Sequence, residues 1–170
     1  DNATIDNSTV CYGSVLMSIS NRTVQNQIMT ESDPPSVIAM RMQTKTNSLI
    51  TANSTSTKNC NTTINVTFNE PMDITSLTTN TLNTFCSGSI RVSDNSSTFF
   101  SSCVRMTSAS PASTDNETFI LTPSAALSNS TTYKIRVTTD AKDPSGNPME
   151  SDNTTGIGFI ISGDSGKYGC

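Results

Sequence analysis

Histidine and tryptophan are missing from this chain of 170 residues, and charged and aromatic side chains make up only 14% and 5% of it. Without histidine, a serine or cysteine nucleophile lacks its usual imidazole base, and zinc lacks its commonest ligand. The net charge is −4 and no basic run is present to neutralise phosphates, so we do not expect nucleic acid as a partner. No apolar stretch approaches the roughly 20 residues that cross a bilayer, so we expect no membrane span.

A catalytic motif is equally hard to find. The stretch SGDSG at 162–166 looks like the neighbourhood of the nucleophile in chymotrypsin-like proteases, but Ser165 has no histidine to activate it. Lys167 is an alternative base, yet it lies in a glycine-rich tail that we expect to be poorly ordered. We therefore expect no enzyme activity and no catalytic residues.

Serine, threonine and asparagine are abundant instead. Serine and asparagine compete with the helical backbone for hydrogen bonds, and threonine suits pleated strands, so the composition favours an all-β fold. It also produces many N-x-S/T motifs, which accept N-linked glycans in secreted proteins. We favour chance as their origin. The motifs begin at Asn2, Asn7, Asn21, Asn53, Asn61, Asn65, Asn95, Asn116, Asn129 and Asn153.

Short runs of alternating apolar and polar residues follow one another through most of the chain. This alternation is typical of antiparallel strands that have one buried and one wet face. The apolar positions expected to share a face are Ile38, Met40 and Met42; Ile64, Val66 and Phe68; Ile90 and Val92; Phe119 and Leu121; Tyr133, Ile135 and Val137; and Ile157, Phe159 and Ile161. Val104 and Met106 form a further run whose facing is unclear. Together the runs predict an antiparallel β-sandwich of about seven or eight strands.

Two adjacent prolines, Pro34 and Pro35, favour extended backbone before them and indicate a boundary. We therefore divide the chain into an N-terminal extension at 1–33, a sandwich at 34–162 and a glycine-rich tail at 163–170.

The N-terminal extension contains one alternating run, in which Val15, Met17 and Ile19 share a face. Such a run can be an additional edge strand of its own chain. Alternatively, it can be a donor strand that pairs with the sheet edge of a neighbouring subunit.

The five cysteines show no C-x-x-C spacing, and we interpret them as disulfide-forming residues of an oxidising compartment. Cys86 and Cys103 bracket a strand–turn–strand segment and are expected to pair. The pairing of Cys11, Cys60 and Cys170 stays open, and one of them is a candidate for a bond between chains.

Three stretches resemble the bacterial Ig-like domain named after surface-layer proteins, the SbsA-type domain. They are INVTFNEPMD at 64–73, TFILTPSAALSNSTTYKIRVTT at 118–139 and KDPSGNPM at 142–149. The resemblance covers roughly residues 34–162 and implies an Ig-like sandwich at a cell surface or in a secreted assembly. It implies no catalytic residues. The leader before the domain and the five cysteines depart from an ordinary tandem module.

The acidic residues of two loops form a candidate calcium site. Carboxylates and carbonyls could supply the oxygens that calcium needs, and surface-layer assemblies often use this ion. The set comprises Glu70, Asp73, Asp140, Asp143 and Asn147. We favour a structural turn, because Asp143 before a proline suits an Asx turn and Gly146 suits a positive φ.

Leu127 and Tyr133 predict a tyrosine corner, in which the phenol hydroxyl bonds to backbone a few residues upstream. A plain core tyrosine is the alternative interpretation.

The function that these observations favour is a non-catalytic structural subunit of an extracellular or cell-surface assembly, such as a surface layer, fibre or pilus-like filament. Its partners would be further copies or other surface proteins, associated through edge strands. An adhesin-type module that recognises a host, matrix or glycan ligand through its loops is the alternative.

Overall fold

The computed structural model divides the chain into two compact units, Asp1–Ser32 and Asp33–Cys170. In full, the structure describes residues 33–43, 62–82, 85–94 and 100–161, and the backbone alone of residues 3–4, 9–12, 15–18, 23–24 and 49–51.

The described residues of the first unit form two strand pairs. β1 (Ala3–Thr4) pairs with β4 (Thr23–Val24), and β2 (Thr9–Tyr12) pairs antiparallel with β3 (Val15–Ser18). The alternating run of the extension thus forms β3, which has a partner within its own unit. Ile19 lies outside the described residues.

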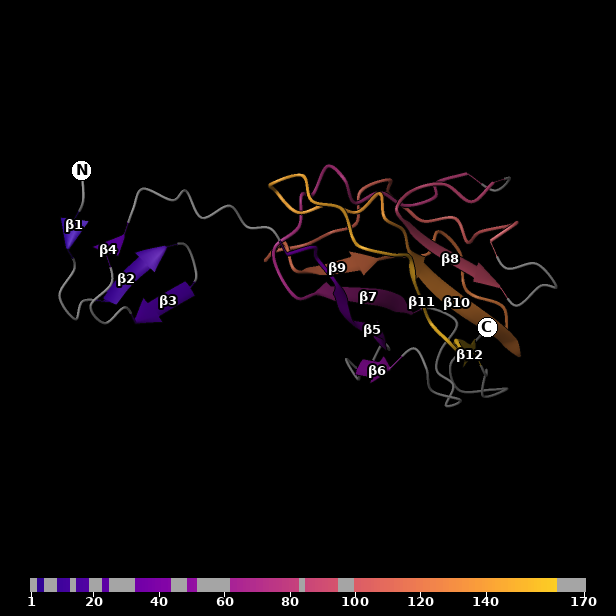
Figure 1. Cartoon of the computed structure of the whole chain (residues 1–170). Helices are drawn as coiled ribbons and strands as arrows, with labels where there is room; N and C mark the ends of the chain where they lie inside the picture. The colour runs from indigo at the N-terminus through magenta and orange to yellow at the C-terminus, as the bar shows by residue number, and fades with distance from the viewer. Residues whose placement is uncertain are drawn as a thin grey trace. The chain divides into compact units, whose positions relative to one another are not determined.

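The second unit contains two antiparallel sheets (Figure 1). The first sheet has the order β6–β5–β7–β9, formed by β6 (Leu49–Thr51), β5 (Val37–Gln43), β7 (Thr63–Phe68) and β9 (Thr118–Leu121). In the second sheet, β10 (Thr131–Val137) is central. It pairs with β8 (Ile90–Asp94) and with β11 (Asn153–Thr154) and β12 (Phe159–Ile161). This architecture confirms the predicted all-β antiparallel sandwich.

The core lies between the two sheets and is formed by the apolar members of the alternating runs. Although the strands are rich in polar residues, every second side chain is apolar and is buried between the sheets. This burial supplies the hydrophobic stabilisation of the fold. Phe68 and Phe119 contact edge to face, with ring centroids 5.9 Å apart. Further buried side chains are Met42, Ile64, Val66, Ile90, Val92, Leu121, Tyr133, Ile135, Val137, Phe159 and Ile161.

Two of the predicted facings are wrong. Ile38 is 64% exposed rather than in line with Met40 and Met42, because the pairing with β7 shifts register between Val37 and Ala39. Such a bulge reverses the facing of the residues before it. Ile157 is also 64% exposed, since β12 begins only at Phe159.

The stretch 103–106 is not a strand either. Val104 donates its N–H to the carbonyl of Val92 at 2.7 Å, and Met106 makes an isolated bridge with Pro123. Met106 is buried, and Val104 packs against the core from outside it.

One edge of the second sheet is interrupted between β11 and β12. There the hydroxyl of Thr155 accepts the N–H of Ile135 at 3.0 Å, so a side chain replaces a ladder carbonyl. Gly158 follows with φ +83, and a Cβ on it would collide with the backbone carbonyl of Tyr133. The joint therefore requires glycine, and it separates β11 from β12.

Candidate functional site

The turn after β10 is closed by its own polar groups. Asp143 is 1% exposed, and its carboxylate accepts the N–H of Asn147 at 2.8 Å and the Asn147 side-chain amide at 2.7 Å. The N–H of Gly146 donates to the Asp143 carbonyl at 3.0 Å, and Gly146 has φ +90. Because both oxygens of the carboxylate are already bonded within the turn, this geometry favours a structural turn.

The loop after β7 does meet this turn, as the calcium hypothesis requires. The N–H of Asp73 donates to the carbonyl of Lys142 at 2.9 Å. The Asp73 carboxylate, however, accepts the N–H of Thr75 at 2.9 Å and the Thr75 hydroxyl at 2.8 Å. These two bonds lower the pKa of Asp73, and the bond from the Thr75 N–H has the larger effect.

The remaining acids of the proposed calcium set do not converge with these. Asp140 accepts the hydroxyl of Thr138 at 3.1 Å, and Glu70 lies next to Asp73's loop, before Pro71. Within the described ranges, no group of three or more His, Cys, Asp or Glu side chains is arranged to hold a metal ion.

Tyr133 has the geometry of a tyrosine corner. Its hydroxyl oxygen accepts the N–H of Ser128 at 2.8 Å, five residues upstream. Leu127 and Tyr133 are both buried, and the Tyr133 ring stacks on Phe159 at 5.7 Å between centroids. The corner thereby fixes the loop that leads into β10.

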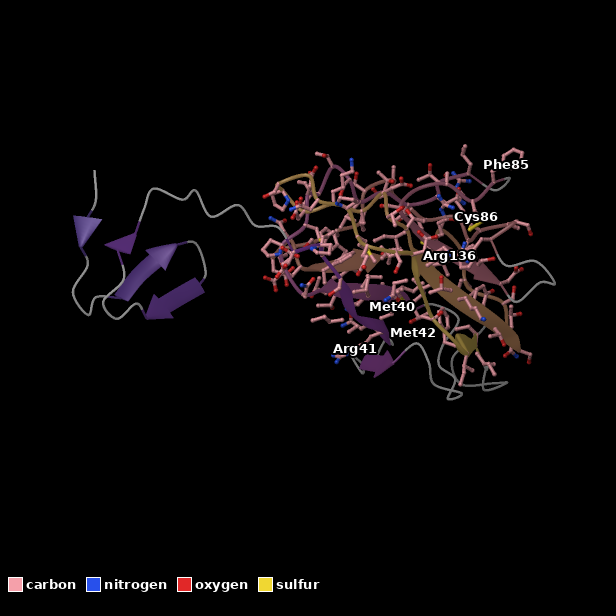
Figure 2. The ribbon with its side chains drawn as sticks, viewed as in Figure 1. Met40, Arg41, Met42, Phe85, Cys86 and Arg136 are labelled. Atoms are coloured by element: carbon pink, nitrogen blue, oxygen red, sulfur yellow. A yellow bond between two sulfur atoms is a disulfide. The ribbon has the colours of Figure 1, made fainter. Side chains whose placement is uncertain are left out.

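Cys86 and Cys103 form a disulfide, with their Cα atoms 4.9 Å apart (Figure 2). The bond joins the segment before β8 to the segment that follows it, where Val104 pairs with Val92. Cys11 lies in β2, of which the backbone alone is described, and Cys60 and Cys170 lie outside the described residues.

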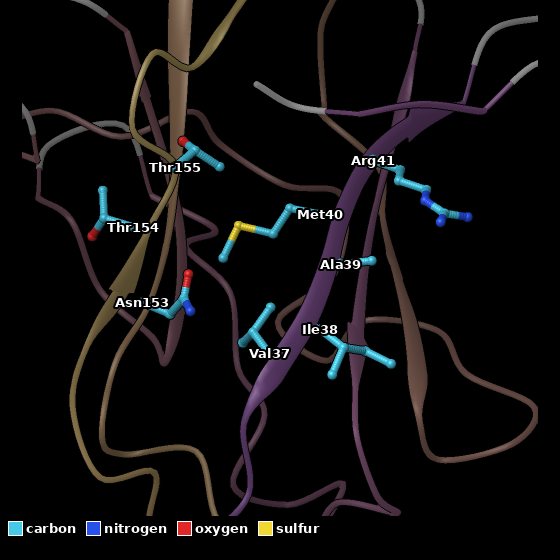
Figure 3. Close-up of a pocket in the computed structure, with 8 residues that line it drawn as sticks. All are labelled: Val37, Ile38, Ala39, Met40, Arg41, Asn153, Thr154 and Thr155. Carbon is cyan, nitrogen blue, oxygen red and sulfur yellow. The ribbon is translucent and has the colours of Figure 1, made fainter. Parts of the chain in front are cut away.

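A groove of about 260 Å³ between β5 and β11 was not predicted from the sequence (Figure 3). It is lined by residues 37–41 of the first sheet and 153–155 of the second. Figure 3 shows the side chains of Met40 and Val37 on the side of β5 that faces β11, while Ile38 and Arg41 point away. The sandwich is therefore open along this side.

The groove lies along the part of the β5 edge where the described residues supply no neighbouring strand. β6 pairs only with Arg41–Gln43, so in the described part of the chain Val37–Met40 have a neighbouring strand on the β7 side alone. The N–H of Phe68 bonds to Glu117, on the β9 side. Backbone groups alternate in direction along a strand, so Val66, two residues before Phe68, also directs its N–H toward β9. Met40 is paired with Val66, and its own N–H and C=O therefore point away from β7.

A family model described as a bacterial Ig-like domain matches residues 31–160. The chain belongs to this bacterial Ig-like domain family. The match does not distinguish the surface-layer type that the sequence resembles. No curated protein and no solved structure gives a significant match.

Family membership indicates the general type of protein to which this Ig-like chain is similar. Domains of this family occur in bacterial surface proteins and are typically non-enzymatic. Among the residues that the structure describes, no helix is long and apolar enough to span a membrane.

Proposed function

We propose that this Ig-like chain is a non-catalytic structural subunit of an extracellular or cell-surface assembly, and that copies associate through edge strands. The family and the Cys86–Cys103 disulfide support a surface location, because disulfides persist in oxidising compartments. The observation that carries the proposal is the groove between β5 and β11.

An unpaired strand edge offers a row of N–H and C=O groups to any extended segment that reaches it. In the groove, Met40 supplies such groups, and its flexible thioether side chain, 8% exposed, forms part of the floor. The bulge at Val37 and Ala39 twists this edge locally and fixes which side chains an added strand would meet.

The donor in this proposal is the N-terminal unit of a neighbouring copy. β3, which carries Val15 and Met17, pairs with β2 along one side. A hairpin of this kind can still add a strand through its other side, so pairing within the unit is compatible with donation.

An edge-blocking substitution tests the proposal. Asn153→Lys places a charge in the groove, where edge lysines oppose strand addition. Ser151→Lys is the matched control, since it adds the same charge in an exposed turn two residues earlier. We expect Asn153→Lys to weaken self-association of the full chain at least tenfold, measured by sedimentation velocity and electron microscopy, while Ser151→Lys assembles normally.

Equal assembly of both variants and the parent chain would contradict association through the groove. Deleting residues 1–25 gives a second readout. Loss of polymers with an unchanged melting temperature identifies a donor segment, whereas a lower melting temperature with intact polymers identifies a purely internal strand and overturns the donor assignment.

An adhesin-type binding role is the second candidate, and one observation favours it. Leu82 and Phe85 are 65% and 76% exposed, and the adjacent Cys86–Cys103 disulfide holds their segment (Figure 2). Anchored, exposed apolar side chains are typical of recognition loops. This candidate would be favoured if the parent chain is monomeric and binds a matrix protein, and if Phe85→Ser abolishes that binding.

A further inference from the structure

Two arginines stand directly opposite each other on the outer face of the second sheet. Arg91 of β8 pairs in register with Arg136 of β10. Their neighbours Ile90, Val92 and Ile135 are buried, so strand alternation turns both arginines outward. Like charges in this position repel, and the chain as a whole is acidic.

Neutral groups hold both guanidinium groups in place. Arg91 donates from Nε to the carbonyl of Gly88 at 2.8 Å, and Arg136 donates from Nε to the hydroxyl of Thr154 at 3.0 Å. Arg136 also lies over the ring of Phe100, 4.1 Å from its centroid. Within the described ranges, neither arginine bonds to a carboxylate, and both keep their terminal amino groups for an anion.

Carboxylates gather elsewhere in the same unit, where β5 begins, β7 ends and β9 begins. Three backbone bonds join these segments: Phe68 to Glu117 at 3.0 Å, Asn69 to Ser36 at 3.0 Å and Met72 to Asn116 at 2.8 Å. The carboxylates that this end carries are Asp33, Glu70, Asp73, Asp115 and Glu117. We call this set the acidic end.

Backbone hydrogen bonds stabilise the charged form of Asp115, one of the carboxylates of the acidic end. The backbone N–H groups of Thr118 and Glu117 donate to Asp115 at 2.8 and 3.0 Å and lower its pKa. Figure 1 shows the end of β7 and the start of β9 on one side of the unit, away from the β8–β10 strand pair. The two charged regions therefore do not neutralise each other within one copy.

We infer that the Arg91–Arg136 pair docks the acidic end of a second copy of this chain. The inference deepens the proposed function by adding a second contact to the same assembly. A chain that carries both the cationic face and its complement needs no other partner. Because the two surfaces differ, the contact is heterologous, so it leaves one free surface at each end of a growing row and can continue into an open filament.

The test isolates this contact in the full chain with Asn153→Lys, whose groove is blocked. We expect this chain to keep a weak self-association at low salt, measured by sedimentation velocity, and to lose it near 0.5 M salt, where charges are screened over a few ångströms. Replacing either Arg91 or Arg136 by Gln should weaken it about five-fold. Arg105→Gln removes an equal charge at an exposed position outside the pair and should leave the self-association unchanged.

Mixing variants tests the heterologous geometry. In the same background, Arg91→Gln with Arg136→Gln removes the cationic face, and Asp115→Asn with Glu117→Gln weakens the acidic end. Each double variant alone should be monomeric. Their mixture should form a 1:1 dimer and nothing longer, because only one matching pair of surfaces remains.

Circular dichroism melts confirm that each variant is folded. If both double variants self-associate as strongly as the chain without these substitutions, the inference is wrong. It is also wrong if the mixture of the two double variants stays monomeric. Arginine-dependent binding to heparin beads, combined with unchanged self-association, assigns the pair to an acidic polysaccharide and also overturns it. The groove proposal is tested separately, by comparing the assembly of Asn153→Lys with that of Ser151→Lys.

Discussion

The turn at 140–148 and the groove between β5 and β11 are both polar, but they use polarity in opposite ways. In the turn, both oxygens of the buried Asp143 carboxylate accept hydrogen bonds from Asn147 of the same loop. In the groove, Asn153 is exposed and Met40 turns backbone groups toward a side that has no strand in the described chain. The comparison shows that a cluster of acids can serve a turn, whereas the edge on which the proposed function rests has no conspicuous sequence motif.

The largest effect is expected at the joint between β11 and β12, next to the groove. Gly158→Ala places a Cβ against the carbonyl of Tyr133 at a positive φ, so the β11–β12 joint must shift. We expect the free energy of unfolding to fall by about 3 kcal/mol. Urea denaturation measures it, and Gly156→Ala, where a Cβ has open space, is the control. A loss below about 1 kcal/mol would mean that the joint is not fixed by this contact.

A smaller loss is expected in the turn. Asp143→Ala removes the carboxylate that accepts two hydrogen bonds from Asn147, at a cost of about 2 kcal/mol in unfolding free energy. Asp140→Ala removes an exposed carboxylate and should cost under about 0.5 kcal/mol. If calcium raised the melting temperature of the parent chain but not of Asp143→Ala, the turn would be a metal site and the comparison would fail.

The smallest effect on stability is expected in the groove itself. Asn153→Ala removes an exposed side chain that makes no hydrogen bond among the described residues, so the unfolding free energy should change by no more than about 0.5 kcal/mol. The same thermal and urea measurements apply. A loss equal to that of Asp143→Ala would show that the groove is part of the supporting framework rather than a free surface.

The sequence was sufficient for the parts of this fold that depend on local alternation. Ile64, Val66 and Phe68 alternate without interruption and are buried together. The exposure of Ile38 could not be predicted, because no sequence motif indicates the bulge that adds a residue to β5. Only the partner strand, more than 20 residues away, reveals the register shift.

The groove and the arginine pair were beyond sequence reasoning for a related physical reason. Which half of β5 lacks a partner depends on how far β6 extends along it. That Arg91 faces Arg136 depends on the register of two strands separated by a long stretch of chain. The Cys86–Cys103 pair, in contrast, needed only the strand–turn–strand pattern between the cysteines.

That disulfide also has a mechanical consequence for a chain built into a load-bearing array. Cys86 and Cys103 are 17 positions apart, so pulling on the two ends cannot straighten the segment between them. At about 3.5 Å per residue, roughly 60 Å of contour length stays locked while the bond is intact. β8 lies inside the locked segment, so a stretched subunit would keep this strand within a disulfide-closed loop. The segment could be extended only after the disulfide is reduced.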